Sequence, residues 1–309
     1  MRKIIGIGET ILDILFKDGI AATSVPGGST FNSMISLGRI GIPSCFLSEI
    51  GDDRVGEILR VFLVGNGVDD RYLEVYQNRK SSMSLAFLDD CNNAAYSFYK
   101  ESYDKHTDWQ CPAIMRDDII LFGSYYAIDP NMRYKIKALL DEARNVGAII
   151  YYDVNFRRNH AGEAIKLMGT VIENLEYADI VRGSDEDFEV LYHLDEGAKV
   201  YTQKTAFYCP RLLYSRGAKG VEVHSNTLTK HYAIEPIIPV STIGAGDNLN
   251  AGVLYGIIKN RIRRDDLDYL SEHDWDDIIC CGLAFSAEAC RHIDNYISRE
   301  FAKDFLQKE

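Results

Sequence analysis

The sequence predicts an α/β protein built around a mainly parallel sheet, and two features lead to this prediction. Short apolar runs alternate along the chain with segments of helical period, which is typical of strands joined by crossover helices. The apolar runs are also hydrophobic on both faces, as burial between two layers of helices requires. The candidate strands are residues 3–7, 44–48, 118–122, 148–153, 179–182 and 212–215.

The segments between these runs place apolar residues at the spacing of one helix face. Seven of them are long enough to cross from one parallel strand to the next. The candidate helices are residues 30–40, 54–65, 132–145, 163–176, 185–193, 245–259 and 275–292. The chain has 309 residues, of which 46% are hydrophobic, so a large core can form.

One region departs from this alternation. Residues 82–88 and 94–99 alternate with period two around the polar segment 89–93, which predicts a hairpin. Residues 14–25 also read as extended. We expect a single domain over 1–309 that carries a small β-flap, formed from about 13–29 and 82–100, which closes over the sheet and excludes water. A simple edge hairpin is the alternative.

The charge and the cysteines narrow the functional classes. A net charge of −12 argues against non-specific binding to nucleic acid or to anionic membranes. The seven cysteines form no Cys-x-x-Cys pair, so neither a disulfide framework nor a zinc site is indicated. Glu9 and Asp13 interrupt the first apolar run too early for a signal peptide, and no stretch reaches the length of a membrane span. We therefore expect a soluble, cytoplasmic protein.

Residues 240–252 carry the most specific chemical signal. They read as a strand end, a Gly-Ala-Gly turn at 244–246 and a helix that begins around Asp247. The amides of a helix N-terminus attract anions, and glycine lets an anion approach the backbone. An acid there would repel the anion unless it takes a proton from a hydroxyl that attacks a bound phosphoryl group. The alternative is a plain turn with a capping aspartate.

Polar residues also follow several predicted strands, where ligands of open α/β sheets bind. Asp13 can accept two sugar hydroxyls, and Asn32, in a segment that includes Gly28, offers a donor and an acceptor to a polyol. Arg157, four residues after Asp153, can hold a phosphate or an anionic substrate. Ordinary loop, turn and ion-pair roles explain each of these residues equally well when it is taken alone.

Two further turns have structural alternatives. Ser184 and Asp187 form a variant of the helix capping box, while acids in that first turn can also hold the waters of a magnesium ion. Residues 215–220 are a glycine turn between two strands, which either borders a nucleotide or is a plain hairpin.

The order of these segments resembles that of the PfkB carbohydrate kinase family, with its ribokinase-like fold, over residues 1–292. Residues 26–32 resemble the family signature Gly-Gly-x-x-x-Asn, and 51–56 resemble Gly-x-Asp-x-x-Gly. Residues 240–252 resemble the second signature, Asp-Thr-x-Gly-Ala-Gly-Asp, which is the most diagnostic. The segments 8–9, 97–100, 122–124 and 153–157 resemble those of fructokinases and 2-keto-3-deoxygluconate kinases.

The resemblance implies a three-layer sandwich with a β-lid, and an ATP- and Mg²⁺-dependent transfer of phosphoryl to a sugar hydroxymethyl group, with fructose as the first choice. Asp247 would be the catalytic base, and the amides of Gly244, Ala245 and Gly246 would form the anion hole. The implied sugar ligands are Asp13, Gly28, Asn32, Lys100 and Arg157. The implied nucleotide contacts are Ser184, Ser215 and Gly217, and the implied magnesium ligands are Asp187 and Glu186.

The chain departs from the family pattern at several positions. Ser241 replaces an aspartate that helps to hold a monovalent cation in many members, so the resemblance does not imply activation by K⁺. Asp187 stands for a longer glutamate, and Lys100 stands for an arginine whose fork it cannot reproduce. The alternatives are a 2-keto-3-deoxygluconate or nucleoside kinase, or a non-catalytic sugar or nucleotide sensor. The flap is also a candidate surface for a homodimer.

Overall fold

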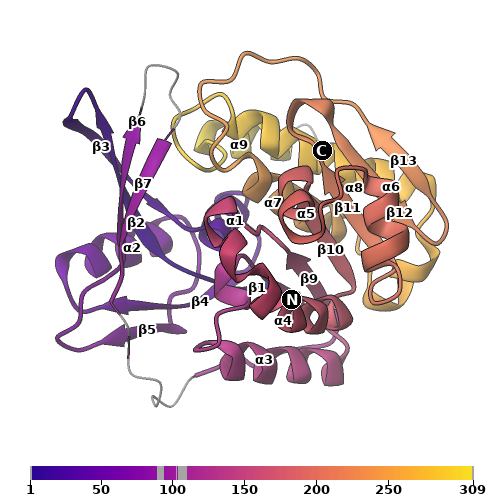
Figure 1. The fold of residues 1–309 in the computed structure, drawn as a ribbon, viewed down its shortest axis with the longest axis horizontal. Helices are drawn as coiled ribbons and strands as arrows, with labels where there is room; N and C mark the ends of the chain where they lie inside the picture. Colours follow the sequence, from indigo (N-terminus) through magenta and orange to yellow (C-terminus); the bar gives the residue numbers. More distant parts are fainter. Residues whose placement is uncertain (1, 89–93, 102, 104–109, 308–309) are drawn as a thin grey trace.

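The computed structural model describes residues 2–88, 94–101, 103 and 110–307. Its main feature is a nine-stranded sheet with the order β13-β12-β11-β10-β9-β8-β1-β4-β5 (Figure 1). The strands β12 and β13 at one edge are antiparallel to their neighbours, and the other strand pairs are parallel. The strands are β1 (Ile4–Ile7), β4 (Ser44–Gly51), β5 (Leu73–Tyr76), β8 (Ile119–Gly123), β9 (Ile149–Asp153), β10 (Ile180–Ser184), β11 (Arg211–Ser215), β12 (Val221–Ser225) and β13 (Thr229–Tyr232).

Helices cover both faces of this sheet and produce two separate hydrophobic cores. Alternate strand residues point into opposite cores: Ile4 and Tyr151 into one, Ile5 and Tyr152 into the other. The first core also contains side chains of α1 (Ser29–Arg39), α2 (Arg54–Gly65), α7 (Ala245–Lys259), α8 (Glu272–Ala289) and α9 (Arg299–Gln307). The second contains side chains of α3 (Arg133–Val146), α4 (Ala164–Tyr177), α5 (Asp185–Tyr192) and α6 (Gly197–Val200). The predicted three-layer sandwich with a mainly parallel sheet is confirmed.

The predicted elements match the structure to within three residues at nearly every end. The largest differences are of three residues, and one of them is at α8, which begins at Glu272 rather than at 275. Ser271 accepts a hydrogen bond from the Asp274 amide, and the Asp274 carboxylate accepts one from the Ser271 amide. This capping box begins the helix one turn before its apolar stripe becomes recognisable.

A separate four-stranded sheet stands beside the large one, with the order β3-β2-β6-β7 (Figure 1). It consists of β2 (Ile11–Lys17) and β3 (Ile20–Gly27), which pair antiparallel, and of the predicted hairpin β6 (Met83–Leu88) and β7 (Ala94–Tyr99). A parallel pairing of β2 with β6 joins the two hairpins. The two extended pieces of the predicted flap therefore do form one sheet, while the predicted turn 89–93 lies outside the described residues.

Among the helices of the described ranges, none combines the length and the apolar character that crossing a membrane requires.

Candidate active site

The first turn of α7 holds two glycines that no other residue can replace without a shift. Gly244 is left-handed, with φ of 79°, and a Cβ there would lie 2.6 Å from the carbonyl oxygen of Asn295. A Cβ on Gly246 would lie 2.7 Å from the Arg182 guanidinium. Within the described part of the chain, the amides of Gly244, Gly246 and Asp247 have no hydrogen-bond partner, whereas the Ala245 amide donates to Thr242 at 3.3 Å. Three free amides and the helix dipole thus make this turn suited to an anion.

Asp247 is buried at this turn and is held by α1. The Asn32 Nδ2 donates to Asp247 Oδ2 at 2.8 Å, and the Ser33 hydroxyl donates to the Asp247 backbone oxygen at 2.7 Å. The two residues of this carboxylate–amide pair are only 6% and 4% exposed. The Asn32 Oδ1 is also buried and has no partner among the described residues, so it remains able to accept a hydrogen bond from a ligand hydroxyl.

The surroundings of Asp247 shift the pKa of its carboxyl group in a direction that favours proton transfer. Burial raises the pKa of the Asp247 carboxyl above its ordinary value, and the neighbouring Asp153 adds to the rise. The hydrogen bond from Asn32 and the charge of Arg157 act in the opposite direction. A buried carboxylate with a raised pKa is a better proton acceptor than a solvated one, which suits a general base.

A buried network of hydrogen bonds lies beside the first turn of α7. Arg182, in the middle of β10, donates to Asp153 at 3.0 Å and to the Ser215 hydroxyl at 2.7 Å. Asn250, on α7, donates to the other oxygen of Asp153 at 2.9 Å and accepts from the Tyr151 hydroxyl. Arg182 was not among the predicted site residues, although a charged residue within an apolar strand was a usable signal. The hydroxyl of Ser215, expected near the nucleotide, is used by Arg182.

Asp13 lies where the two sheets meet. It accepts a hydrogen bond from the Ser84 hydroxyl, and burial raises the pKa of Asp13 to about 6. Its carboxylate lies against Gly27, where a Cβ would be 2.7 Å from Oδ2. Gly28 has φ of 123°, and a Cβ there would lie 2.1 Å from the Glu9 carbonyl oxygen. The Asp13 carboxylate and the Glu9 carbonyl group thus lie close to the backbone of Gly27 and Gly28, where any larger residue would clash with them.

The two cations expected at the sugar differ in their surroundings. The Lys100 ammonium forms an ion pair with the Glu9 carboxylate at 2.5 Å. Arg157 is exposed, and it forms no hydrogen bond or ion pair with another residue of the described part. The charge of Arg157 lowers the pKa of Asp247, so the two side chains lie within electrostatic reach of each other.

The residues expected at the nucleotide and at magnesium lie at the end of β10, in the first turn of α5, at the end of β11 and in the turn after it. Asp187 Oδ2 accepts from both the amide and the hydroxyl of Ser184, which confirms the capping box. Glu186 is paired with Arg158 at 3.1 Å. Gly217 has φ of 52° and open space around it. Over the described ranges there is no group of three or more metal-ligating side chains.

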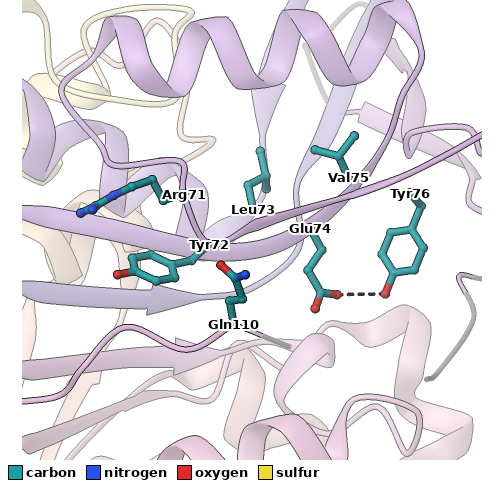
Figure 2. A pocket seen from close by; sticks show the side chains of 7 residues that line it. All are labelled: Arg71, Tyr72, Leu73, Glu74, Val75, Tyr76 and Gln110. Carbon is teal, nitrogen blue, oxygen red and sulfur yellow. Dashed lines mark hydrogen bonds between the residues drawn. The ribbon is translucent and has the colours of Figure 1, made fainter. Parts of the chain in front are cut away.

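A cavity of about 240 Å³ lies elsewhere, along the edge strand β5 (Figure 2). Glu74 accepts a hydrogen bond from Tyr76 there, and the buried Lys135 donates to Glu74 at 2.5 Å and to Glu49 at 2.8 Å. None of the residues expected at the sugar, the nucleotide or the base lines this cavity. The charged cluster beside it is a structural element that joins α3 to the sheet.

Comparisons with known proteins bear on the family and on the fold. A fructokinase of Rhizobium leguminosarum bv. trifolii is 29% identical over 268 residues, which are 80% of this chain and 77% of that protein. A crystal structure of a fructokinase from Vibrio cholerae O395, with fructose, ADP and calcium bound, superposes with a TM-score of 0.84 at 21% identity and covers 99% of each chain.

An aminoimidazole riboside kinase from Salmonella enterica superposes with a TM-score of 0.82 at 20% identity, again over 99% of each chain. At these identities the two structural matches concern the fold alone. The sequence model of the pfkB family carbohydrate kinases matches residues 1–300. This match covers nearly the whole chain and includes the signature turn at Asp247, and the protein therefore belongs to the pfkB family of carbohydrate kinases.

Proposed function

We propose that this kinase transfers the γ-phosphoryl group of ATP to the hydroxymethyl group of a neutral sugar, with fructose as the first choice. The observation that carries the proposal is the buried pair of Asp247 and Asn32 at the N-terminus of α7. It combines a proton acceptor, a free amide oxygen for a substrate hydroxyl and unpartnered backbone amides for a phosphoryl group.

The proposed reaction uses these groups in one step. The sugar hydroxyl gives its proton to the Asp247 carboxylate while its oxygen attacks the γ-phosphorus in line, and the bond from that phosphorus to the leaving oxygen of ADP breaks. The amides at Gly244, Ala245 and Gly246, together with that of Asp247, face the charge that develops on the transferred group. Since the Ala245 amide is already used in the turn, the amides of Gly244, Gly246 and Asp247 carry most of this task.

Sugar binding is assigned to Asp13, Gly28, Asn32, Lys100 and Arg157. The four-stranded sheet supplies Asp13 directly and Lys100 just past its last strand, so we propose that it acts as a lid over the sugar. In this proposal residues 1–309 form one kinase domain, with the lid at about 13–29 and 82–100. A lid that closes over the sugar also keeps water away from the phosphoryl group.

The nucleotide is assigned to the turn after β11 and to the end of β10, where Gly217 leaves open space beside Ser215 and Ser184. Magnesium, when bound, would neutralise the phosphate charge. Asp187 uses only Oδ2 for its capping bonds, which leaves Oδ1 for a water of the ion, and Glu186 lies beside it. Such a sparse acidic site suits magnesium, which keeps several of its waters and takes other ligands from the phosphates.

The activities of related proteins support fructose among the sugars. The Rhizobium leguminosarum relative is a fructokinase, and the Vibrio cholerae enzyme was solved with fructose and ADP. A nucleoside acceptor is the second candidate, because the Salmonella enterica neighbour is a kinase of a riboside. A non-catalytic sensor is less well supported, since a binding protein has no use for a buried base at its phosphoryl site.

The test is ADP release from ATP and Mg²⁺ with a panel of free sugars, sugar acids and nucleosides, with and without K⁺. We expect fructose to give the highest kcat/KM. A nucleoside that exceeds fructose would establish the second candidate. Thermal stabilisation by a sugar with no ADP release from any acceptor would contradict the kinase proposal and favour the sensor. The difference in turnover with and without K⁺ shows whether the enzyme needs a monovalent cation although Ser241 replaces the aspartate.

The cytoplasmic location and a homodimer through the lid stay predictions. The lid does expose apolar side chains, among them Ile20, Phe87, Phe98 and Tyr99. An exposed apolar patch of this kind is compatible with self-association, which light scattering of the purified protein measures directly.

A further inference from the structure

A buried asparagine with a free side-chain amide lies between the proposed sugar ligands and the α7 turn. Asn295 is 5% exposed, and its backbone oxygen accepts a hydrogen bond, whereas its side-chain amide forms none with any residue that the structure describes. Buried polar groups of native proteins have a partner in the large majority of cases, so a buried amide that stays free indicates a missing ligand. The amide offers two donors and an acceptor to such a ligand.

The Asn295 amide lies near the Asp13 carboxylate, beside Gly27. A Cβ on Gly27 would lie 2.7 Å from Asp13 Oδ2 and 3.7 Å from Asn295 Nδ2, so both atoms border the same space. Strand register puts Asp13 and Gly27 on one face of the lid, because Gly27 pairs with Ile11, two positions before the aspartate. Since Gly27 carries no side chain, a ligand atom has room between the carboxylate and the amide.

The chain holds Asn295 in place from two sides. Its carbonyl oxygen accepts a hydrogen bond from Asn248 Nδ2, on α7, at 2.8 Å, and would lie 2.6 Å from a Cβ on Gly244. The next residue, Tyr296, donates its hydroxyl to the carbonyl oxygen of Pro26, near the end of β3, at 2.8 Å. Asn295 is thus fixed both to the α7 turn and to the strand that leads to the sugar-binding backbone.

A carboxylate beside an amide is complementary to one hydroxyl group. The hydroxyl donates its hydrogen to the Asp13 carboxylate and accepts a hydrogen from the Asn295 amide. At the α7 turn, Asp247 and Asn32 combine a carboxylate and an amide in the same way. The pKa of Asp13 is raised by burial to about 6, so above this pH its carboxylate acts as an acceptor and leaves the donor role to Asn295.

We propose that Asn295 is a further substrate-contact residue, whose side-chain amide binds the same non-reacting sugar hydroxyl as Asp13 and so selects acceptors that carry this hydroxyl. The inference rests on the proposed function and deepens it, since it assigns a specificity-determining residue outside the segments that resemble the family signatures. A contact with a non-reacting hydroxyl exists in the ground state and in the transition state alike. It should therefore act on the affinity for the sugar and not on the chemical step.

The first experiment measures the steady-state kinetics of Asn295→Ala with fructose. We expect the KM for fructose to rise about tenfold, which corresponds to one buried hydrogen bond to a ligand. The kcat and the KM for ATP should stay within about threefold. Asn295→Asp keeps the shape of the side chain but replaces the donor by a charge that repels Asp13, so its KM for fructose should rise further. It provides the same test if the alanine variant fails to fold.

Analogues of fructose that each lack one non-reacting hydroxyl test the contact itself. With the wild-type enzyme, one analogue should have a kcat/KM at least about 100-fold below that of fructose, because it leaves two buried groups without a partner. In Asn295→Ala this ratio should shrink about tenfold. Asp13→Ala should shrink the ratio for the same analogue, whereas the ratios for the other analogues should not change in Asn295→Ala.

Asp294 provides the matched control. It precedes Asn295, its side chain is exposed, and it lines a cavity to which neither Asn295 nor Asp13 belongs. Asp294→Ala shortens a side chain in the same segment and should leave the KM for fructose within about twofold.

Three results would overturn the inference: a KM for fructose in Asn295→Ala within twofold of wild type, an equal rise in Asp294→Ala, or a loss that is the same for every analogue, as a purely structural role would give. If the wild-type enzyme phosphorylates fructose, any of these contradicts only this inference. An inactive wild-type enzyme on the whole panel contradicts the proposed function instead. Calorimetry with fructose then still tests the contact, because Asn295→Ala should bind the sugar about tenfold more weakly.

Discussion

Replacing Asp247 by asparagine isolates the role of the base. The change keeps the shape of the side chain and leaves an oxygen to accept the Asn32 hydrogen bond, now 2.8 Å long. The free amides of the α7 turn and the charge of Arg157 also remain. Only proton removal is lost, and general-base catalysis is worth roughly 10²–10⁴-fold, or about 2.7–5.5 kcal/mol of activation free energy.

The assay is steady-state ADP release with fructose, together with thermal unfolding. We expect kcat to fall by this factor, the KM for fructose to stay within about threefold, and the melting temperature to stay equal or rise, because burial disfavours the carboxylate that is removed. Asp277→Asn, at an exposed carboxylate on α8, is the matched control and should keep full activity. A kcat of the Asp247 variant within tenfold of wild type would refute the assignment of the base.

Three further variants test separate parts of the site and of the fold. Gly246→Ala places a Cβ 2.7 Å from a buried guanidinium and should lower kcat about 10²-fold by displacing the amides, whereas Gly169→Ala, with open space around its Cβ, should keep wild-type kcat. Lys135→Met leaves the mostly buried Glu49 and Glu74 carboxylates without their cation and should cost about 3–5 kcal/mol in urea unfolding at pH 8; the loss should be smaller at lower pH, because burial raises the pKa of Glu49, and equal losses at both pH values would contradict this. The KM for fructose should rise as the pH falls below about 6, because Asp13 then gains a proton. In Ser84→Ala the hydrogen bond that lowers this pKa is lost, so the rise should begin at higher pH, and an unchanged profile would exclude Asp13 as the titrating group.

The helices and strands that could be predicted are those whose pattern of buried residues is visible in a short stretch of sequence. A strand buried on both faces, such as β9, reads as a continuous apolar run, and α7 begins at its glycine turn. The strand β5 was not predicted, because it has only four residues and contains Glu74. That charge is tolerated there because Lys135 reaches it from α3, 61 residues further along the chain. The helix α9 was also not predicted; its Phe301 packs on Phe285 of α8.

The candidate site likewise has a part that could be predicted from the sequence and a part that could not. The glycines of the α7 turn and the acid after them were recognisable, because a helix N-terminus with glycines is a local feature. The partners of these residues were not recognisable. Arg182 lies under Gly246 only because β10 ends beside α7, and Lys100 meets Glu9 only because the lid folds toward β1.

By itself, the sequence determined the α/β class, the order of the crossover helices and the signature of a phosphoryl-transferring turn, since each depends on residues close together in the chain. The tertiary structure decided which groups share one buried space. It joined Asn32 to Asp247 across 215 residues and left an amide oxygen free beside the base. The physical reason is that burial and charge act through distance in space, so the pKa of Asp247 and the neutralisation of Lys100 depend on neighbours that no local pattern encodes.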